Sequence, residues 1–479
     1  MKTKVLFLLF FCLHIFGQAP GTLDTSFGVD GIVSTTVAGF SYSASLALQA
    51  DEKIIVGGYE ASKLYCIRYN NDGSIDTTFG NNGIASYNAV VGSSFYISTI
   101  AIQANQKIIL GVGPIMVRFN PDGALDTSFG VNGKVTTNFN DIKCIKEEAS
   151  TGKIVIGANV YSDSNNNIII ARFSNSGNLD LSFNTAGTKT LTYYPLGTSQ
   201  EKYIRDLAIQ QDGSISAVGG GWLTGGVDWL RWGSAYRVNA DGTWDTTFDA
   251  DGFVETGTQS NSMILKPDNS IIAAGANVNY SAIMMYRVNP NGTHTPDALN
   301  RFYYNLSNSE AKYLRQDING KYVMTASEFS SSTPFRILVV NPDFTLDTSF
   351  GTNGVVTTTT VFGPQGLETQ LDGKIVVLGK SGNTVKVARY HGSSILSNTS
   401  FDKDSFSIYP NPSKSEINVG ITDNNLLNKK FEIQDVNGRI VSSGIISGLT
   451  TKINISAFNN GIYFLSIENT ATALKIIKL

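Results

Sequence analysis

The sequence predicts an all-β protein: a seven-bladed β-propeller closed by its own N-terminal strand, followed by a small Ig-like β-sandwich. Three observations lead to this prediction. The pentapeptide DTSFG, or a close copy, returns about every 50 residues. Each interval holds four short runs rich in Val, Ile and Tyr, separated by Asp-Gly or Asn-Gly turns. The period is lost after residue 392, where a second pattern of short strands begins.

The repeat can be aligned on the aspartate of DTSFG. Seven positions result: Asp24, Asp76, Asp126, Asp180, Asp245, Thr295 and Asp347. Their spacings are 52, 50, 54, 65, 50 and 52 residues, and Thr295 belongs to a decayed copy that needs no gap. A period near 50 residues indicates a solenoid or a propeller, and four strands per unit favour the propeller.

The strands of one unit can be placed directly. In the second unit they are expected at Ser98–Gln103, Lys107–Val112, Ile115–Asn120 and Lys134–Asn138. One such meander cannot bury both of its faces alone, so the meanders should stack radially. The chain opens with a lone strand and closes, at Tyr390, with a third strand that lacks a fourth. We therefore expect residues 31–37 to pair with the strand ending at Tyr390 and to close the ring.

DTSFG itself is interpreted as scaffold. Its aspartate and its Ser or Thr cap a turn, its Phe fills a gap between layers, and its Gly permits a positive φ. An arginine recurs in the third strand of each unit except at Val339: Arg68, Arg118, Arg172, Arg237, Arg287 and Arg389. Thr295 stands at an aspartate position and Val339 at an arginine position. The two losses fall in the same pair only if each aspartate is paired with the arginine of the next unit. This predicts pairing between neighbouring blades, from Asp24 with Arg68 to Asp347 with Arg389; two separate solvated positions are the alternative.

The pattern G-x-L-D-T-S-F-G-x-N-G-x-V, followed by Q-x-D-G-K-I-x-V-x-G and R-Y-N-x-D-G, resembles the bacterial delta-60 repeat. That family forms propellers and has no known activity. Seven units cover residues 21–392, and the unit around Thr295 departs most from the pattern. The resemblance implies a fold but supplies no catalytic residues.

Residues 393–404 read as a linker, and residues 405–479 as a module of short alternating strands. The module resembles the type A C-terminal sorting domain of the Bacteroidetes type IX secretion system. The matching residues are Tyr409, Pro410, Asn411, Pro412, Gly438, Arg439, Gly461, Tyr463, Lys475 and Lys478. The resemblance implies that the type IX secretion machinery is a partner; an ordinary Ig-like appendage is the alternative.

The other end of the chain is typical of a signal peptide. Lys2 and Lys4 precede an apolar run, and Gly17 offers a small residue for cleavage, so residues 1–17 should be removed. No other stretch approaches the roughly 20 apolar residues of a membrane span. We expect a protein that is secreted or lies on the outer cell surface, reached through the periplasm. A net charge of -3 argues against a nucleic-acid partner.

Little in the sequence points to catalysis or to a metal. The two cysteines and two histidines beyond the signal peptide cannot build a disulfide framework and supply a zinc site or a histidine triad poorly. Asp163, Asn165 and Asn167 have the spacing of a calcium loop, but Ile168 and Ser174 replace the required glycine and glutamate. We expect no cofactor, no metal and no catalytic residue.

Two functions remain open. The first is a binding or adhesion module for a saccharide or protein ligand. The second is an extracellular propeller hydrolase or lyase acting on polysaccharide. Length varies between units mainly in residues 158–167, 220–234 and 326–334, and the middle loop holds the candidate ligand-binding residues Trp222, Trp229, Arg231 and Trp232. The alternative for this loop is a hydrophobic flap packed on the neighbouring blade.

Overall fold

The computed structural model describes most of the chain, and every named element in the described part is a β-strand. The described residues are 18–36, 42–60, 63–88, 97–161, 166–191, 200–223, 231–294, 301–328, 334–381, 384–393, 406–421, 426–435, 439–468 and 473–478. The chain forms two compact units, Met1–Ser394 and Ile395–Leu479. The predicted signal peptide and nearly all of the predicted linker lie outside the described residues.

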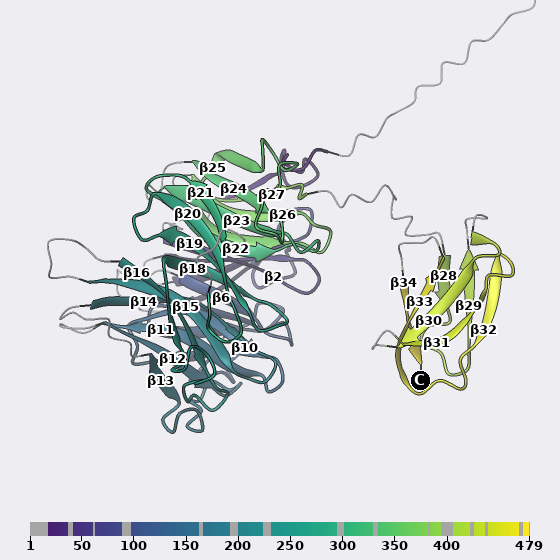
Figure 1. The fold of residues 1–479 in the computed structure, drawn as a ribbon, viewed down its shortest axis with the longest axis horizontal. Coiled ribbons are helices and arrows are strands. Elements are labelled where there is room, and N and C mark those ends of the chain that lie inside the picture. Colours follow the sequence, from purple (N-terminus) through teal and green to yellow (C-terminus); the bar gives the residue numbers. More distant parts are fainter. Residues whose placement is uncertain are drawn as a thin grey trace, which may run out of the picture. The chain divides into compact units, whose positions relative to one another are not determined.

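The larger unit is made of antiparallel sheets whose strands follow one another in the sequence (Figure 1). Five of these sheets have four strands each: β2 (Tyr42–Leu48), β3 (Ile54–Glu60), β4 (Lys63–Tyr69) and β5 (Ile84–Asn88); β6 (Ile97–Ile102), β7 (Ile108–Val112), β8 (Ile115–Phe119) and β9 (Lys134–Thr136); β10 (Asp141–Glu148), β11 (Lys153–Val160), β12 (Asn167–Phe173) and β13 (Thr188–Leu191); β14 (Gln200–Ile209), β15 (Ile215–Leu223), β16 (Arg231–Val238) and β17 (Phe253–Thr256); β18 (Thr258–Leu265), β19 (Ile271–Asn277), β20 (Ala282–Val288) and β21 (Arg301–Asn305). The strands predicted for the second unit agree with β6–β9 to within two residues at each end.

A sixth sheet has seven strands because one of its strands serves two meanders. Its order is β1 (Ile32–Thr35), β27 (Thr384–Tyr390), β26 (Ile375–Ser381), β25 (Val355–Thr369), β24 (Pro334–Val340), β23 (Tyr322–Glu328) and β22 (Ser309–Gln316). Early in β25, Thr357 pairs with Arg336 of β24, and late in the same strand Leu367 pairs with Val377 of β26. The chain thus passes from one meander into the next without a break in the sheet.

The N-terminal strand β1 pairs antiparallel with β27, as the sequence predicts. The register joins Ile32 to Ala388 and Thr35 to Val385. The contact continues beyond the strand, since the amide of Gly21 donates to the carbonyl of His391 at 2.7 Å. Residues more than 340 positions apart in the sequence therefore lie on neighbouring strands.

The first strands of successive meanders touch one another in series. β2 contacts β6, and the series continues through β10, β14, β18, β22 and the later part of β25, which contacts β2 again. The apolar cores lie between consecutive meanders. One of them joins Leu46, Ile54 and Val56 of the first meander to Val376 and Leu378 of the last.

Each DTSFG segment folds as predicted. At Asp76, one carboxylate oxygen accepts hydrogen bonds from the amide and the hydroxyl of Thr78, at 3.1 and 2.6 Å. The phenylalanines of the motif are fully buried: Phe27, Phe79, Phe129, Phe183, Phe248 and Phe350. Gly80 has a φ of 54°. A Cβ there would lie 2.4 Å from the carbonyl oxygen of Ile84, so only glycine fits this tight turn.

The predicted partner of the third-strand arginine is wrong. Five of the six motif aspartates pair with an arginine of their own sheet, not with that of the next, at N–O distances of 2.5–2.8 Å: Arg68 with Asp76, Arg118 with Asp126, Arg172 with Asp180, Arg237 with Asp245 and Arg389 with Asp24. The reason is local. The turn after the third strand reverses the chain, and the amide of the aspartate then donates to the carbonyl of the arginine eight residues earlier. For Asp24 the partner comes from β27, because β1 completes that sheet.

The same arginine still links neighbouring sheets, by a different bond. Nη1 of Arg68 donates to the carbonyl of Pro121, in the turn of the next meander, at 2.6 Å. Its guanidinium also stacks on Phe79, with the central carbon 4.5 Å from the ring centroid. A lysine from the second strand adds a further cation in most units, as Lys53 does to Asp76 at 2.9 Å. We call this set of aspartate, arginine, lysine and phenylalanine the aspartate latch.

The smaller unit contains two sheets around one apolar core. One is β28 (Phe406–Tyr409), β29 (Glu416–Ile421) and β32 (Thr450–Asn454); the other is β31 (Ile440–Ile445), β30 (Lys430–Asp435), β33 (Gly461–Ile467) and β34 (Ala473–Lys478). Val419 and Ile453 from the first sheet meet Ile433 and Leu465 from the second in that core.

Candidate functional site

A cavity of about 130 Å³ lies where the first strands of the meanders meet, and all seven of these strands line it. Each contributes side chains from the same part of the strand: Ser45 and Leu46, Thr99 and Ile100, Cys144 and Lys146, Arg205 and Asp206, Asn261 and Ser262, Tyr313 and Arg315, and Gly366 and Glu368. We call it the axial cavity. None of these residues was proposed from the sequence. One signal was present: the first-strand position that holds Ala47 and Ala101 in the early units holds the charged residues Lys146, Arg315 and Glu368 in later units.

A β-bulge in each first strand shapes the entrance of this cavity. The register slips between Ile142 and Cys144, between Ile204 and Asp206, and at the equivalent place in the other first strands. A bulge bends the strand and redirects its side chains. Four consecutive meanders place Lys143, Arg205, Asn261 and Lys312 at the bulge, and in β25 the register slips over residues 363–365.

The bulges explain the last glycine of the Q-x-D-G-K-I-x-V-x-G pattern. Gly219 pairs with Ile204 beside the bulge, and a Cβ on it would lie 2.0 Å from the carbonyl oxygen of Tyr203. At Gly275 the corresponding distance, to the carbonyl oxygen of Gln259, is 1.7 Å. In these two units the second strand therefore has no room for a side chain beside the bulge, whereas Val112, Ala158 and Ala326 occupy the equivalent position in three others.

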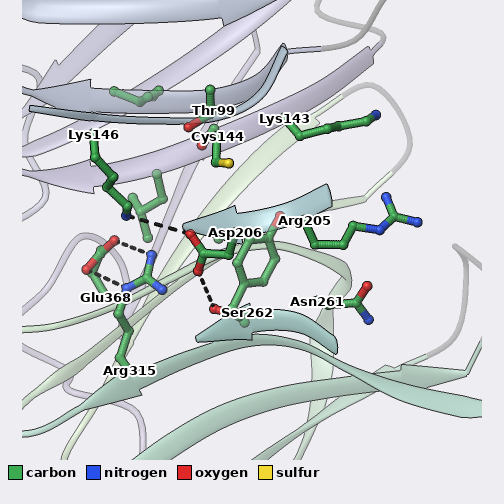
Figure 2. A pocket seen from close by; sticks show the side chains of 15 residues that line it. Thr99, Lys143, Cys144, Lys146, Arg205, Asp206, Asn261, Ser262, Arg315 and Glu368 are labelled. Carbon is green, nitrogen blue, oxygen red and sulfur yellow. Dashed lines mark hydrogen bonds and ion pairs between the residues drawn. The ribbon is translucent and has the colours of Figure 1, made fainter. Parts of the chain in front are cut away.

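Deep in the cavity the charges are paired (Figure 2). Arg315 donates two hydrogen bonds to Glu368, from Nε at 3.0 Å and from Nη2 at 2.8 Å. Burial disfavours the charged guanidinium, but the Glu368 carboxylate outweighs burial and raises the pKa of Arg315. Asp206 accepts from Ser262 Oγ at 3.2 Å and from the amide of Met263 at 3.0 Å, with Lys146 Nζ at 3.9 Å. These carboxylates are held as hydrogen-bond acceptors.

Three of the bulged residues, Lys143, Arg205 and Asn261, gather on one side of the cavity (Figure 2). Lys143 is ion-paired with Asp141, and the side-chain amide of Asn261 donates to Glu310 at 2.6 Å. Arg205 is exposed, and its guanidinium carbon lies 4.4 Å from the ring centroid of Tyr203. We call this side the rim of the axial cavity.

The structure describes three of the four predicted ligand-binding residues and places them in two different surroundings. Trp222 and Arg231 pair with each other at the ends of β15 and β16, and both are half-buried. Trp232 is only 3% exposed and packs in the core between two meanders, as in the flap alternative. Trp229 lies outside the described residues, as do the central parts of the other two variable loops.

Trp222 and Arg231 lie next to the rim. The Trp222 ring contacts that of Tyr203 at 5.8 Å between centroids, and Tyr203 also lies against Arg205. Arg231 lies over Tyr280, 4.3 Å from its centroid. Tyr280 donates to Gln259, whose amide donates to the carbonyl of Gly221 at 2.9 Å. The predicted loop and the unpredicted cavity therefore meet through two tyrosines.

Other reactive groups are poorly placed for chemistry. Burial raises the pKa of the Cys144 thiol, which lies in the wall of the cavity, and that of Cys66. Among the described residues no group of three or more His, Cys, Asp or Glu side chains could hold a metal ion. Asp163 and Asn165 of the calcium-like spacing lie outside those residues. In the same described ranges, no helix is long and apolar enough to cross a membrane.

Most of the sorting-motif residues surround the last strand, β34. The side chain of Asn411 donates to the carbonyl of Lys475 at 2.6 Å and accepts from the amide of Ile477 at 2.8 Å. Tyr463 is 8% exposed and donates to the carbonyl of Asn459. Tyr409, Arg439 and Lys475 are exposed, Lys478 is buried, and Gly438 lies outside the described residues.

Solved structures similar to this chain share little sequence with it. The chain is 10% identical to PorZ, a surface component of the type IX secretion system of the oral bacterium Porphyromonas gingivalis, with a TM-score of 0.41, and it spans 59% of the PorZ chain while 92% of its own length is covered. It is 12% identical to the virginiamycin B lyase of Staphylococcus aureus and to the WD40 propeller domain of Doa1, each with a TM-score of 0.45 over 74% of this chain and 98% and 96% of theirs. A comparison with curated protein sequences found no match.

Two family models match parts of the chain. Residues 407–479 match the family described as "Secretion system C-terminal sorting domain". Residues 49–79, 111–129 and 149–183 match the family described as "Domain of unknown function (DUF5122) beta-propeller". The sorting resemblance is thereby confirmed, and the propeller match is compatible with the delta-60 repeat. The chain therefore carries a secretion-system C-terminal sorting domain behind a β-propeller of a family of unknown function, and it is a secreted or cell-surface protein exported through the periplasm by type IX secretion.

Proposed function

We propose that the larger unit is a closed seven-bladed propeller that acts outside the cell as a binding module. Seven first strands that contact one another in series, and the core shared by the first and last meanders, support closure. In this arrangement β22–β25 and β25–β27 with β1 form the sixth and seventh blades. The smaller unit, with two sheets around one core, is then the Ig-like sandwich that carries the export signal.

One observation carries the binding function: the rim joins redirected polar side chains to a group of aromatic rings in contact. Trp222 and Tyr280 are half-buried and leave part of their rings accessible, the buried Tyr203 supports Trp222 and Arg205, and Arg205 and Arg231 present hydrogen-bond donors beside them. Aromatic residues and arginines contribute most to binding at protein surfaces, because they combine large contact area with directional bonds. Ligand pockets combine apolar lining with a few placed polar groups in the same way.

Binding is favoured over hydrolysis or elimination by the state of the cavity carboxylates. Glu368 is held by the two donors of Arg315, and Asp206 accepts from Ser262 and from a backbone amide. A general acid or base needs a proton to exchange with the substrate and a pKa near the working pH. Carboxylates that already accept from fixed donors suit the positioning of neighbouring cations better.

The binding function is tested with the full chain against a panel of polysaccharides and bacterial surface proteins, with turnover assays on the same polysaccharides. We expect saturable binding of at least one ligand without turnover, and weaker binding by Trp222→Ala. Tyr303→Ala, which removes an exposed ring from the fourth strand β21, is the matched control and should bind normally. Turnover of any polysaccharide, or binding that Trp222→Ala leaves unchanged, would refute this proposal.

The export role is tested by deleting residues 405–479. The truncated protein should fold but remain in the periplasm, because the signal for the outer-membrane step is gone. Cell fractionation and protease protection of whole cells measure its location. Continued appearance of the truncated protein outside the cell would show that another segment directs export.

A further inference from the structure

The charges around the rim do not cancel among the described side chains. Lys143 is paired with Asp141, Lys312 with Glu310, and Arg315 with Glu368. The fourth carboxylate, Asp206, has Lys146 nearby and three further hydrogen-bond donors, from Ser262 and the amides of Leu207 and Met263. Each carboxylate thus already has a cation of its own, and the two remaining cations are Arg205 and Arg231.

Both remaining arginines make the same kind of contact. Arg205 lies over Tyr203 and Arg231 over Tyr280, and neither has a carboxylate within ion-pair distance in the part of the chain that is described. Stacking on a ring fixes the plane of a guanidinium while leaving its edge N–H groups free to donate. Such an edge binds a carboxylate or a sulfate by two parallel hydrogen bonds.

The two arginines act on one small region. Arg231 is the strand partner of Trp222, whose ring contacts Tyr203, and Arg205 lies over that same tyrosine. Burial raises the pKa of both Tyr203 and Tyr280; the Glu310 carboxylate adds to that rise at each hydroxyl, and the positive charges of Arg205 and Arg231 partly oppose it. Glu310 is itself held by Lys312 and Asn261. Arg205 is exposed and lies on the side of the cavity where Lys143 and Asn261 also lie (Figure 2). An anion on the rim would therefore meet two cations.

The neighbouring ring surface favours a sugar as the carrier of that anion. Trp222 is half-buried against Tyr203, so one part of its indole is packed and another part remains accessible. An indole face next to a free guanidinium edge matches a sugar ring that bears an acidic group. The whole chain has a net charge of -3, so attraction of a polyanion must come from this local arrangement.

We propose that the rim binds an anionic polysaccharide, with the acidic group on Arg205 and Arg231 and the sugar ring against Trp222. This inference rests on the proposed binding function and specifies its ligand. The shared chemistry is a carboxylate or a sulfate on a sugar chain, and the experiment separates the two sources.

The test measures the affinity of the full chain for polygalacturonate, chondroitin sulfate and uncharged dextran by isothermal titration calorimetry. We expect binding of at least one anionic polymer and none of dextran. Arg205→Gln and Arg231→Gln should each weaken the anionic binding about tenfold or more, since each removes charge-assisted hydrogen bonds. Arg301→Gln, on the fourth strand β21, is the matched control and should bind as the unchanged protein does. Thermal unfolding confirms that each variant folds.

The outcomes distinguish this inference from the binding function itself. Equal affinity of Arg205→Gln, or equal binding of dextran and the anionic polymers, overturns the inference and leaves a binding module with another ligand. Binding of a surface protein but of no polysaccharide also overturns the inference and leaves the binding function intact. If neither a protein nor a polysaccharide binds in either experiment, both proposals fail. A preference between polygalacturonate and chondroitin sulfate assigns the acidic group as carboxylate or sulfate.

Discussion

The aspartate latch and the rim belong to the same repeat but differ in how much they vary between units. At the latch, five units join an aspartate to an arginine, and the phenylalanine beneath is buried in all six DTSFG-type copies. At the first-strand bulge, which contributes the rim residues, the side chain is Lys143, Arg205, Asn261 or Lys312 in four consecutive units. The latch therefore keeps the same residue types from unit to unit, whereas the residue at the bulge changes from unit to unit.

Exceptions at the latch are compensated within the unit. Where Val339 replaces the arginine, Asp347 is held by Lys321 at 2.7 Å and by the Ser393 hydroxyl. Where Thr295 replaces the aspartate, Arg287 pairs with Asp268. A buried carboxylate without a partner is costly, so a loss on one side requires a change on the other.

The largest effect should come from acid, which acts on all latches together. Burial raises the pKa of the latch aspartates, but the hydroxyl and amide donors and the adjacent cations outweigh it, so the pKa of Asp347 falls from 3.8 to about 2 and those of Asp24, Asp76, Asp126 and Asp180 lie well below their usual range. The stabilisation is therefore complete above about pH 4 and is lost as the pH falls through the folded-state values. Urea midpoints should be level between pH 5 and pH 7 and fall steeply below pH 4. A midpoint unchanged at pH 3 would contradict this role of the latch.

Deleting residues 21–37 should have the next largest effect. The deletion removes Asp24, which leaves the buried Arg389 without its carboxylate at a cost of about 3–5 kcal/mol. It also uncovers the edge of β27 and the core residues Val385 and Val387. Thermal unfolding measures the loss. Deletion of residues 405–479 is the control, because that unit has its own core, and it should leave the propeller transition where it was.

A single latch should be worth less than the closing strand. Asp126→Ala leaves Arg118 and Lys107 without their shared carboxylate, and we expect a loss of about 3–5 kcal/mol in urea unfolding. Asp72→Ala is the matched control. Asp72 caps an exposed turn by the same two bonds to Ser74 but has no ion-pair partner among the described residues, so about 1 kcal/mol or less is expected. Equal losses in the two variants would mean that the turn, not the ion pair, stabilises the sheet.

The smallest effect on stability should come from the glycine opposite a bulge. Gly275→Ala places a Cβ against the carbonyl of Gln259, and the strands must shift at a cost of about 1–3 kcal/mol. Gly257→Ala is the control, since nothing lies within 4 Å of its Cβ. At the equivalent Gly219, the same change should also displace Arg205 and weaken ligand binding. Unaltered stability of Gly275→Ala would show that the bulge does not depend on glycine.

Much of the fold could be predicted from the sequence because its causes are local. The period fixed the number of meanders, Asp-Gly and Asn-Gly pairs marked the turns, and the unpaired strands at the two ends predicted the contact between β1 and β27. The partner of the arginine was not predictable in this way. Within one unit the losses do not coincide, because Arg287 is kept where Thr295 replaces the aspartate and Asp347 is kept where Val339 replaces the arginine.

The sequence by itself determined the strands, the capped turns, the buried phenylalanines and the sorting module, since each depends on residues a few positions apart or on a pattern repeated along the chain. Only the tertiary structure decided which side chains meet at the axis. Lys143, Arg205 and Arg315 come from three different meanders, and the direction of the first two is set by bulges that have no fixed residue type. Tyr203 brings Trp222 and Arg205 together because it contacts the ring of the first and the guanidinium of the second. Such contacts depend on the radial packing of all the meanders, a long-range arrangement that no single segment of sequence encodes.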